Sequence, residues 1–245
     1  MIALIGNDPT LEQIWWTMDF VWKSLGCESR DPENIQKFYA HPVWLLNGLF
    51  IEQHELSLEN RRRMAEYIIP LQPARIADYG GGFGTLARML GEHVTRSKIE
   101  IVEPFPTPLA LQLVESFENL SYAPYLTGTY DLIIATDVLE YVADPLQLIE
   151  LFAAHLSPNG KLLIANCFYP VILCHLPETF HLRYSFTFIL GRMNLKKLAT
   201  VSYATIYTST GKNSITRTIR ILEKCSRFCF PILALLHKIW STMKV

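Results

Sequence analysis

Residues 76–90, IADYGGGFGTLARML, place four glycines directly after a short apolar run. Glycine loses more backbone entropy on folding than any other residue, so a cluster of glycines needs a local reason. Because glycine has no Cβ atom, another molecule can approach the main chain closely at these positions. We therefore expect Gly80, Gly81, Gly82 and Gly84 to form a loop that contacts a ligand.

On both sides of this loop the sequence alternates between strand and helix patterns. Apolar runs typical of buried strands occur at 74–80, 97–104, 130–137 and 161–168, with helical patterns at 84–93, 106–117 and 145–156. The sequence SPNG at 157–160 predicts a turn. Short strands that alternate with helices predict a parallel sheet with right-handed crossovers. The fold class predicted for residues 74–213 is therefore α/β, with a doubly wound, mostly parallel sheet.

The glycine loop joins a strand to a helix N-terminus, where such sheets bind nucleotide-like ligands. Glu103 ends the next strand, 19 residues after Gly84, and can accept hydrogen bonds from ribose hydroxyls. The glycine spacing fits two fingerprints: residues 82–87 satisfy the dinucleotide pattern G-x-G-x-x-A, and residues 78–84 satisfy D-x-G-x-G-x-G. An NAD(P)-dependent oxidoreductase is one alternative, although the chain lacks a Tyr-x-x-x-Lys pair. A non-catalytic binding protein on the same fold is another.

Four segments, taken in order, resemble class I S-adenosylmethionine-dependent methyltransferases. They are the D-x-G-x-G-x-G loop, IEIVEP at 99–104, YDLIIATDVLEYVADP at 130–145 and LSPNGKLLIAN at 156–166. The resemblance extends to LKKLATVSYATIYTST, at 195–210, which would form the antiparallel end of a seven-stranded sheet. It implies methyl transfer from S-adenosylmethionine to a small-molecule acceptor.

The resemblance also implies roles for the cofactor-binding residues. Asp78 would orient the glycine loop and contact the methionine ammonium group, while the glycines pass close to the methionine and ribose. Glu103 would accept hydrogen bonds from both ribose hydroxyls, which is a strong, charge-assisted arrangement. Thr136 and Asp137 would lie near the sulfonium, although a carboxylate at position 137 is also a routine helix N-cap.

The chain departs from the family pattern at two places. The sequence LSYAPYLTG, at 120–128, offers no acidic residue for the adenine amine. Tyr141 stands where quinone-biosynthesis relatives often have His, which weakens any transfer of their substrate or metal chemistry. We expect the adjacent Glu140 to lie on the surface of a helix.

The acceptor is expected to lie between the N-terminal cap and the segment 167–190, which begins CFYPVILCHLPETFHLRYSF, where family members build their substrate pockets. From this segment we expect Tyr169, Arg183 and Tyr184 to bind the acceptor. Trp44, from the aromatic segment at 41–54, would complete the pocket as part of a lid, although core packing also explains that segment.

His175 and His181 are the candidate catalytic residues, and three interpretations of them stay open. Either can act as a base that removes a proton from an oxygen or nitrogen acceptor. The pair can hold a divalent metal with a third ligand such as His41 or His54. Finally, both histidines can have only a structural role, packing against neighbouring side chains or capping a helix.

The two ends of the chain differ from its centre. Residues 1–73 predict a helical cap, with helices at 10–26, 31–40 and 57–69. Residues 214–245 predict a basic amphipathic helix, with six Lys and Arg against one acidic residue, and a break at Pro231. This tail is expected to dock on its own domain, on a second copy as a homodimer, or on a membrane surface. Cys225 and Cys229 are expected to be buried.

Composition limits the remaining function classes. The chain has 245 residues, 50% of them hydrophobic, and a net charge of −1, which argues against a nucleic-acid-binding protein. Its five scattered cysteines include no C-x-x-C pair, and its first residues do not match a secretory signal, so a cytoplasmic location is predicted.

Overall fold

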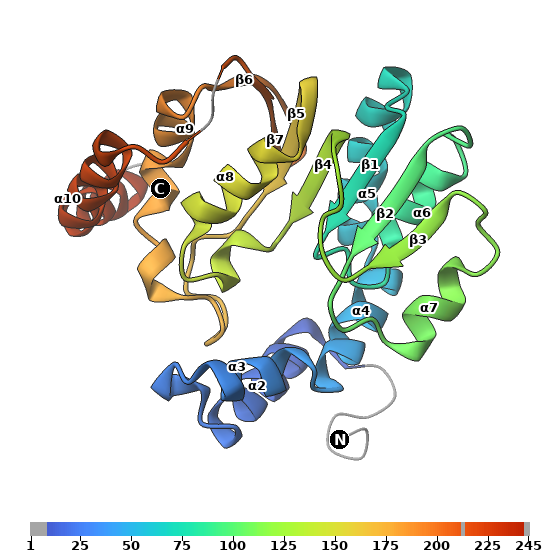
Figure 1. Ribbon diagram of the computed structural model, residues 1–245. Coiled ribbons are helices and arrows are strands. Elements are labelled where there is room, and N and C mark those ends of the chain that lie inside the picture. The colour runs from blue at the N-terminus through green and yellow to red at the C-terminus, as the bar shows by residue number, and fades with distance from the viewer. Residues whose placement is uncertain (1–8, 212–213, 243–245) are drawn as a thin grey trace.

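Seven strands form one sheet within the described residues, 9–211 and 214–242 of the computed structural model, in the order β3-β2-β1-β4-β5-β7-β6 (Figure 1). Their bounds are β1 Arg75–Tyr79, β2 Lys98–Val102, β3 Leu120–Ala123, β4 Tyr130–Thr136, β5 Leu156–Ala165, β6 Leu195–Val201 and β7 Ala204–Ser209. Strands β1 to β5 pair in parallel, whereas β7 is antiparallel to β5 and to β6. The predicted doubly wound sheet and its antiparallel end are confirmed.

Both faces of the sheet are apolar and covered by helices. Because successive strand residues point to opposite faces, Ile76 and Ala77 pack into different hydrophobic clusters. One cluster includes residues of α5 (Glu55–Ile68), α6 (Thr85–Gly91) and α7 (Pro108–Val114). The other includes residues of α8 (Pro145–Ala154) and α9 (Leu182–Arg192).

A third cluster holds the N-terminal helices together with the segment after β5. It joins residues of α2 (Leu11–Ser24), α3 (Pro32–Tyr39) and α4 (Val43–Gln53) to Ile172, Cys174 and Leu176. In Figure 1 the arrowheads of β2 and β4 point toward α2 and α3, so this cap covers the carboxyl edge of the sheet. Helix α5 lies with the sheet and not with the cap, although it belongs to the predicted helical zone 1–73.

The helices of the cap begin where local sequence predicts. Thr10 forms a capping box with Gln13 at the start of α2, and the Asp31 carboxylate accepts a hydrogen bond from Glu33 N (2.8 Å) at the start of α3. Pro32 occupies the first position of α3, where its missing N–H costs nothing. Helix α5 begins at Glu55, two residues before the predicted start.

The C-terminal helix differs from prediction in two ways. Helix α10 (Arg217–Thr242) continues through Pro231 instead of breaking there. Pro231 and Arg227 are both exposed, so water can satisfy the Arg227 carbonyl that proline cannot bond. Cys225 and Cys229 are exposed and not buried, because the helix docks through a different face.

The SPNG sequence lies inside β5 instead of preceding it as a turn. The pairing of β4 with β5 shifts register between Tyr130 and Leu132, and Asn159 adopts a left-handed φ of 65°. The predicted turn is therefore absorbed as an irregularity within the strand. Four short 3₁₀ turns complete the described elements: η1 (Cys27–Ser29), η2 (Ile69–Leu71), η3 (Leu139–Tyr141) and η4 (Pro177–Thr179).

Candidate functional site

The glycine loop leaves β1 at the carboxyl edge and enters α6. A Cβ built on Gly80 would lie 2.6 Å from Val138, and one on Gly84 would lie 2.5 Å from Ile101, so the protein's own packing requires these two glycines. A Cβ on Gly81 would lie 2.8 Å from the Asp78 carboxylate. At Gly82, where φ is +53°, an added Cβ would meet nothing within 4 Å. The open space that a ligand can use is therefore at Gly82.

Two carboxylates lie at the strand ends beside this loop. Asp78, in β1, is only 2% exposed, and its Oδ1 has no hydrogen-bond partner among the described residues. Burial raises the pKa of Asp78 to about 7, although the Arg61 guanidinium favours its ionised form. Glu103 follows β2, and its Oε1 accepts a hydrogen bond from Phe105 N (3.3 Å). Burial raises the pKa of Glu103 also.

These two carboxylates can be compared with the hydrogen-bond donors of S-adenosylmethionine. The cofactor carries an ammonium group and ribose hydroxyls, all of which donate hydrogen bonds. Asp78 offers a buried carboxylate oxygen that has no partner among the described residues, and Glu103 offers a second carboxylate just after the neighbouring strand. Both are acceptors of the required kind. The residues present therefore fit the cofactor.

Thr136 ends β4, which lies next to β1 in the sheet, and Asp137 follows it. Asp137 has a left-handed φ of 54°, and its main-chain N donates to Ala165 O (2.8 Å). Its Oδ2 accepts a hydrogen bond from the Tyr203 hydroxyl (2.8 Å), and no cap hydrogen bond is made to η3. Burial raises the pKa of Asp137, while Tyr203 and the Arg61 guanidinium oppose that shift.

Glu140 was expected on a helix surface, and this is wrong. It is fully buried, because η3 is a single turn that packs beneath the segment after β5. Its Oε1 accepts from Cys167 N (3.0 Å), and its carbonyl accepts from Leu176 N (2.8 Å). Its Oε2 has no partner among the described residues. Burial, reinforced by the nearby Asp137 carboxylate, raises the pKa of Glu140.

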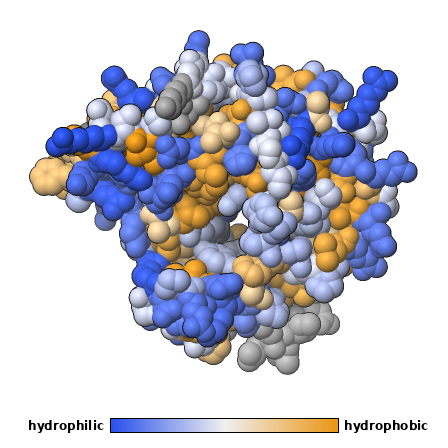
Figure 2. All heavy atoms as spheres, in the orientation of Figure 1, coloured by the Kyte–Doolittle hydropathy of each residue, from blue (hydrophilic) through white to orange (hydrophobic). Residues whose placement is uncertain are grey.

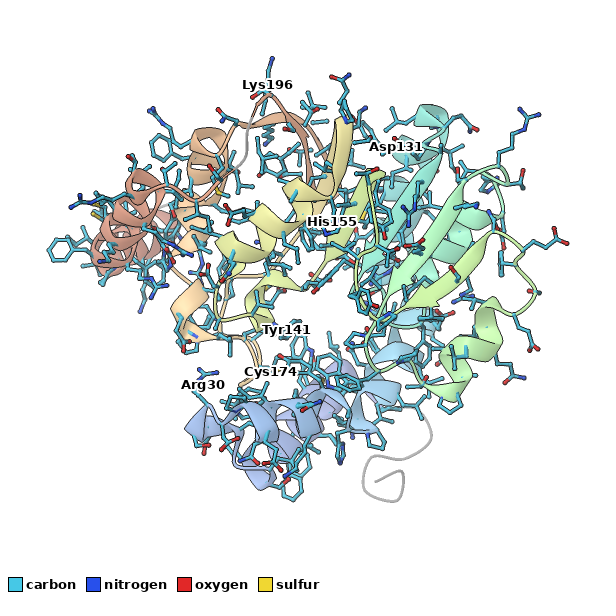
Figure 3. The ribbon with its side chains drawn as sticks, in the orientation of Figure 1. Arg30, Asp131, Tyr141, His155, Cys174 and Lys196 are labelled. Carbon is cyan, nitrogen blue, oxygen red and sulfur yellow. The ribbon has the colours of Figure 1, made fainter. Side chains whose placement is uncertain are left out.

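Trp44 and His175 meet at Tyr141, beneath the cap. Figure 3 shows Tyr141 beside Cys174, where η3 faces the cap helices. The Trp44 ring packs edge-on against Tyr141, with centroids 5.8 Å apart, and its Nε1 donates to Phe38 O (3.1 Å). His175 Nδ1 lies 2.7 Å from Tyr169 O, and Nε2 lies 3.3 Å from the Tyr141 hydroxyl.

The other predicted acceptor residues come together around one cavity of about 250 Å³ beyond the end of β5. Half of its lining is aromatic, and the full lining comprises Ile164, Asn166, Phe168, Tyr169, Leu182, Arg183, Tyr184, Phe186, Thr187, Tyr203, Thr205 and Tyr207. The Arg183 guanidinium stacks 3.4 Å from the Tyr169 ring centroid, and its Nη2 donates to Phe168 O (2.9 Å). Trp44 is not part of this lining.

His181 has other partners, on α10. Its Nδ1 lies 3.0 Å from Ser226 Oγ, and its Nε2 is buried without a partner among the described residues. Burial lowers the pKa of His181 to about 4, assisted by the Arg227 charge. His175 and His181 thus share no hydrogen-bond partner. Within the described ranges, no group of three His, Cys, Asp or Glu residues is placed to hold a metal ion.

A second cavity, of about 310 Å³, lies at the opposite edge of the sheet. Its lining includes Asp131 and Lys161, and Figure 3 places Asp131 far from Tyr141. Doubly wound sheets bind their ligands beyond the carboxyl ends of the strands. The amino-edge cavity is therefore not the candidate site. Figure 2 shows the surface hollowed on the other side, between the cap and the body of the molecule.

Two residues of the site were missed from sequence. Arg61 lies in an arginine run that predicts only a solvated helix face, yet its charge acts on both Asp78 and Asp137. Tyr203 lies between β6 and β7, a segment that the resemblance identified only as the antiparallel end of the sheet, and it joins Asp137 to the cavity beyond β5. Only the pairing of β6 with β7 brings Tyr203 to the carboxyl edge, and no local motif predicts that.

Comparison with known proteins finds similar proteins among the methyltransferases. A family model described as a methyltransferase domain matches residues 51–189. The ubiquinone biosynthesis O-methyltransferase of Vibrio parahaemolyticus serotype O3:K6 (strain RIMD 2210633) is 29% identical over 147 residues, 56% of this chain and 63% of that protein. The protein of the same name from Thiobacillus denitrificans (strain ATCC 25259 / T1) is 30% identical over 141 residues, 53% of this chain and 60% of that one. The match thus spans less than two thirds of these relatives.

Among solved structures, an O-methyltransferase family protein from Burkholderia thailandensis superimposes with a TM-score of 0.52, over 82% of this chain and 71% of that one. At 12% identity, this likeness shows the fold alone. The family model covers more than half of the chain, and the sheet has the seven strands and the antiparallel end expected from the resemblance. The chain therefore belongs to the class I S-adenosylmethionine-dependent methyltransferase family.

Proposed function

We propose that this protein transfers a methyl group from S-adenosylmethionine to a small-molecule acceptor. When bound, the cofactor supplies a methyl group on a sulfonium sulfur, which an acceptor atom displaces in line. The observation that carries the proposal is the open space at Gly82, beside the buried Asp78 carboxylate and the Glu103 carboxylate. The chain's own part is then to bind, to orient and to exclude water.

The proposed cofactor contacts use residues 74–213. Glu103 accepts hydrogen bonds from the two ribose hydroxyls, and Asp78 accepts from the ammonium group. Gly80, Gly81 and Gly84 keep the loop in shape around Gly82. Thr136 and Asp137 lie toward the methionine tail.

To these we add Arg61, which sequence alone did not single out. The methionine portion carries a carboxylate as well as an ammonium group. Arg61 is the cation whose charge acts on Asp78 and Asp137, and its Nη1 donates to Ser57 O (3.1 Å). A guanidinium held there suits a carboxylate, because Arg presents several donors in a fixed plane.

The acceptor is proposed to occupy the cavity beyond β5. Tyr169, Arg183 and Tyr184 line it, and Tyr203 links it to Asp137. Aromatic walls favour an acceptor with a flat or apolar body, and the hydroxyl and guanidinium groups orient its polar part. Trp44 is proposed to act indirectly, by holding Tyr141 in place.

If the acceptor atom carries a proton, His175 is the proposed base. Its Nδ1 lies against the Tyr169 carbonyl, which accepts only, so Nδ1 carries the proton. Nε2 is then the basic nitrogen, and it accepts the long hydrogen bond from the Tyr141 hydroxyl (3.3 Å) that an acceptor group would replace. Burial lowers the pKa of His175, which keeps the ring neutral at pH 7. His181 is the second histidine predicted from sequence, and an alanine substitution at each position compares the two.

The experiment is incubation of the chain with methyl-labelled S-adenosylmethionine and fractionated small-molecule extracts. Label is expected in one acceptor fraction, with S-adenosylhomocysteine formed in equal amount. The Glu103→Ala variant serves as the control for cofactor-dependent transfer. Cofactor binding without transfer to any fraction would favour a non-catalytic binding protein, and binding of NAD(P)H instead would favour an oxidoreductase.

We also propose that α10 is a contact surface, in keeping with the predicted partners of residues 214–245. A second copy of the chain and a membrane surface are the two candidates, with the body of the protein in the cytoplasm. Within the described residues, no helix has the length and apolar character needed to cross a membrane.

A further inference from the structure

Helix α10 docks on its own domain through one face. Ile219 and Glu223 are buried, and Ser226 Oγ lies 3.0 Å from His181 Nδ1. The Phe230 ring lies 6.1 Å from that of Tyr184. Arg220 donates to the Asp144 carboxylate (2.5 Å) and to Glu223 (2.8 Å). These contacts fix how the helix is rotated about its axis.

The opposite face of α10 is apolar and exposed. Phe228 is 81% exposed, Ile232 58% and Leu235 59%. With Ile221 and Cys225, which are also exposed, they recur every three or four residues and so form one stripe along the helix. Figure 1 places α10 at the outer edge of the molecule, away from the N-terminal cap. An apolar stripe of this length on an exposed helix indicates a binding surface.

The charges next to this stripe are all positive among the described residues of α10. Arg217, Lys224, Arg227 and Lys238 are exposed. The acidic residue of the helix, Glu223, is buried and paired with Arg220 and Arg227. On a helical wheel, Arg217 and Lys224 lie directly beside the stripe, on one flank. The described part of α10 therefore combines an apolar face with a basic edge.

This combination separates the two candidate partners. Two copies pairing through the stripe would bring basic flanks together, whereas helix pairs usually place opposite charges beside an apolar seam. An anionic surface complements the same charges, and an interfacial helix buries just such an apolar face at the level of the headgroups. We propose that α10 lies in the surface of an anionic lipid bilayer, with the Ile221–Leu235 stripe inserted and Arg217 and Lys224 against the headgroups.

This surface adjoins the acceptor cavity. Tyr184 and Arg183 line that cavity, and both lie close to Phe230 on the docked face of α10. Attachment through α10 would therefore hold the cavity near the bilayer. The inference deepens the contact surface proposed above and does not depend on methyl transfer.

The test is flotation of the full chain with vesicles of phosphatidylcholine alone, or of phosphatidylcholine mixed with phosphatidylserine. Binding is expected only to the anionic vesicles, and weakened by added salt. The double variant Phe228→Ser/Ile232→Ser should lose at least about tenfold in vesicle affinity, because it removes the centre of the stripe. Arg217→Gln/Lys224→Gln should lose about tenfold, through the charge alone.

A matched control is Leu56→Ser/Leu111→Ser, which removes two exposed leucines on α5 and α7 and should bind like the wild type. Equal binding to neutral vesicles, no binding to either kind, or an equal loss in the control would overturn the proposal. So would a dimer in light scattering that the Phe228→Ser/Ile232→Ser variant dissociates. Calorimetry with S-adenosylmethionine on the same variants reads the cofactor site separately, so the two proposals fail independently.

Discussion

Gly82 differs from its neighbouring glycines in what surrounds its Cα. Val138 and Ile101 occupy the space where Cβ atoms of Gly80 and Gly84 would lie, whereas the space at Gly82 is open. A side chain at position 82 would therefore compete with a ligand more than with the protein. This makes Gly82 the residue at which binding and folding can be separated.

Gly82→Val is expected to abolish S-adenosylmethionine binding in calorimetry. The branched side chain would fill the open space, and its positive φ would cost about 1–2 kcal/mol of stability. Gly84→Val is the comparison, because its side chain would collide with Ile101 and should lower the melting temperature much further. Normal cofactor affinity in a folded Gly82→Val protein would show that the loop is not the binding site.

Glu103→Ala is expected to weaken S-adenosylmethionine binding by about 2–3 kcal/mol, since it removes a charged acceptor of two hydrogen bonds. Glu115→Ala, at an exposed glutamate just after α7, is the control and should bind normally. An unchanged dissociation constant in the Glu103 variant would exclude this residue from the site.

The two histidines should separate in turnover. His175→Ala is expected to keep its cofactor affinity but to lose about 10²–10⁴-fold in turnover, and the loss should shrink as the pH rises. His181→Ala should lose far less, because its Nδ1 is engaged by Ser226. Full activity of the double variant would remove both histidines from the chemistry, and activity that falls with a chelator would favour the metal interpretation.

At this scale, sequence predicted the residues that belong to a motif. Asp78 and Glu103 could be proposed because each lies at the carboxyl end of a strand, at a fixed distance from the glycines. Arg61, Tyr203 and Glu140 could not, because their roles come from packing between segments far apart in the chain. Glu140 in particular resembles any helix-surface glutamate until the segment after β5 is folded over it.

At the scale of elements, the parallel strands β1, β2, β4 and β5 followed from alternation, whereas β3 was not predicted from its own sequence and the other exceptions arose from context. The SPNG sequence has turn residues, yet pairing with β4 keeps it in β5. Pro231 normally ends a helix, yet α10 continues because that part of it is exposed to water. Which face of α10 docks could not be predicted, since it depends on Asp144, His181 and Tyr184 in other elements.

The contact between α9 and α10 should make stability depend on pH through His181. In the unfolded chain its pKa is near 6.5, and in the fold burial lowers the pKa to about 4. Between these values the unfolded chain holds the additional proton, so the free energy of unfolding falls as the pH drops from 6.5 to 4. Above pH 6.5 His181 is neutral in both states, so the free energy of unfolding no longer changes with pH through this residue.

His181→Asn keeps a side-chain N–H for Ser226 but does not titrate. Its stability deficit against the wild type, from urea unfolding, should be largest near neutral pH and shrink by up to about 3 kcal/mol toward the acid end. A deficit that stays constant with pH would show that His181 keeps its ordinary pKa in the fold.

At the scale of the whole molecule, the cap and the sheet enclose the site from two sides. Glu52 of α4 accepts hydrogen bonds from Thr85 (2.5 Å) and from Arg88, both on the helix that follows the glycine loop. Asp19 of α2 accepts from Leu173 N (2.7 Å) in the acceptor segment. The cap thus contacts both the helix after the glycine loop and the segment after β5, and in the proposed reaction these contacts would position the two reactants and exclude water.

The central claim is that the carboxyl edge around Gly82 binds S-adenosylmethionine, and calorimetric titration of the full chain tests it most directly. The account predicts one molecule of S-adenosylmethionine or S-adenosylhomocysteine bound per chain, and no heat with NADH or NADPH. Saturable binding of NADH or NADPH, with no binding of either sulfur compound, would contradict it.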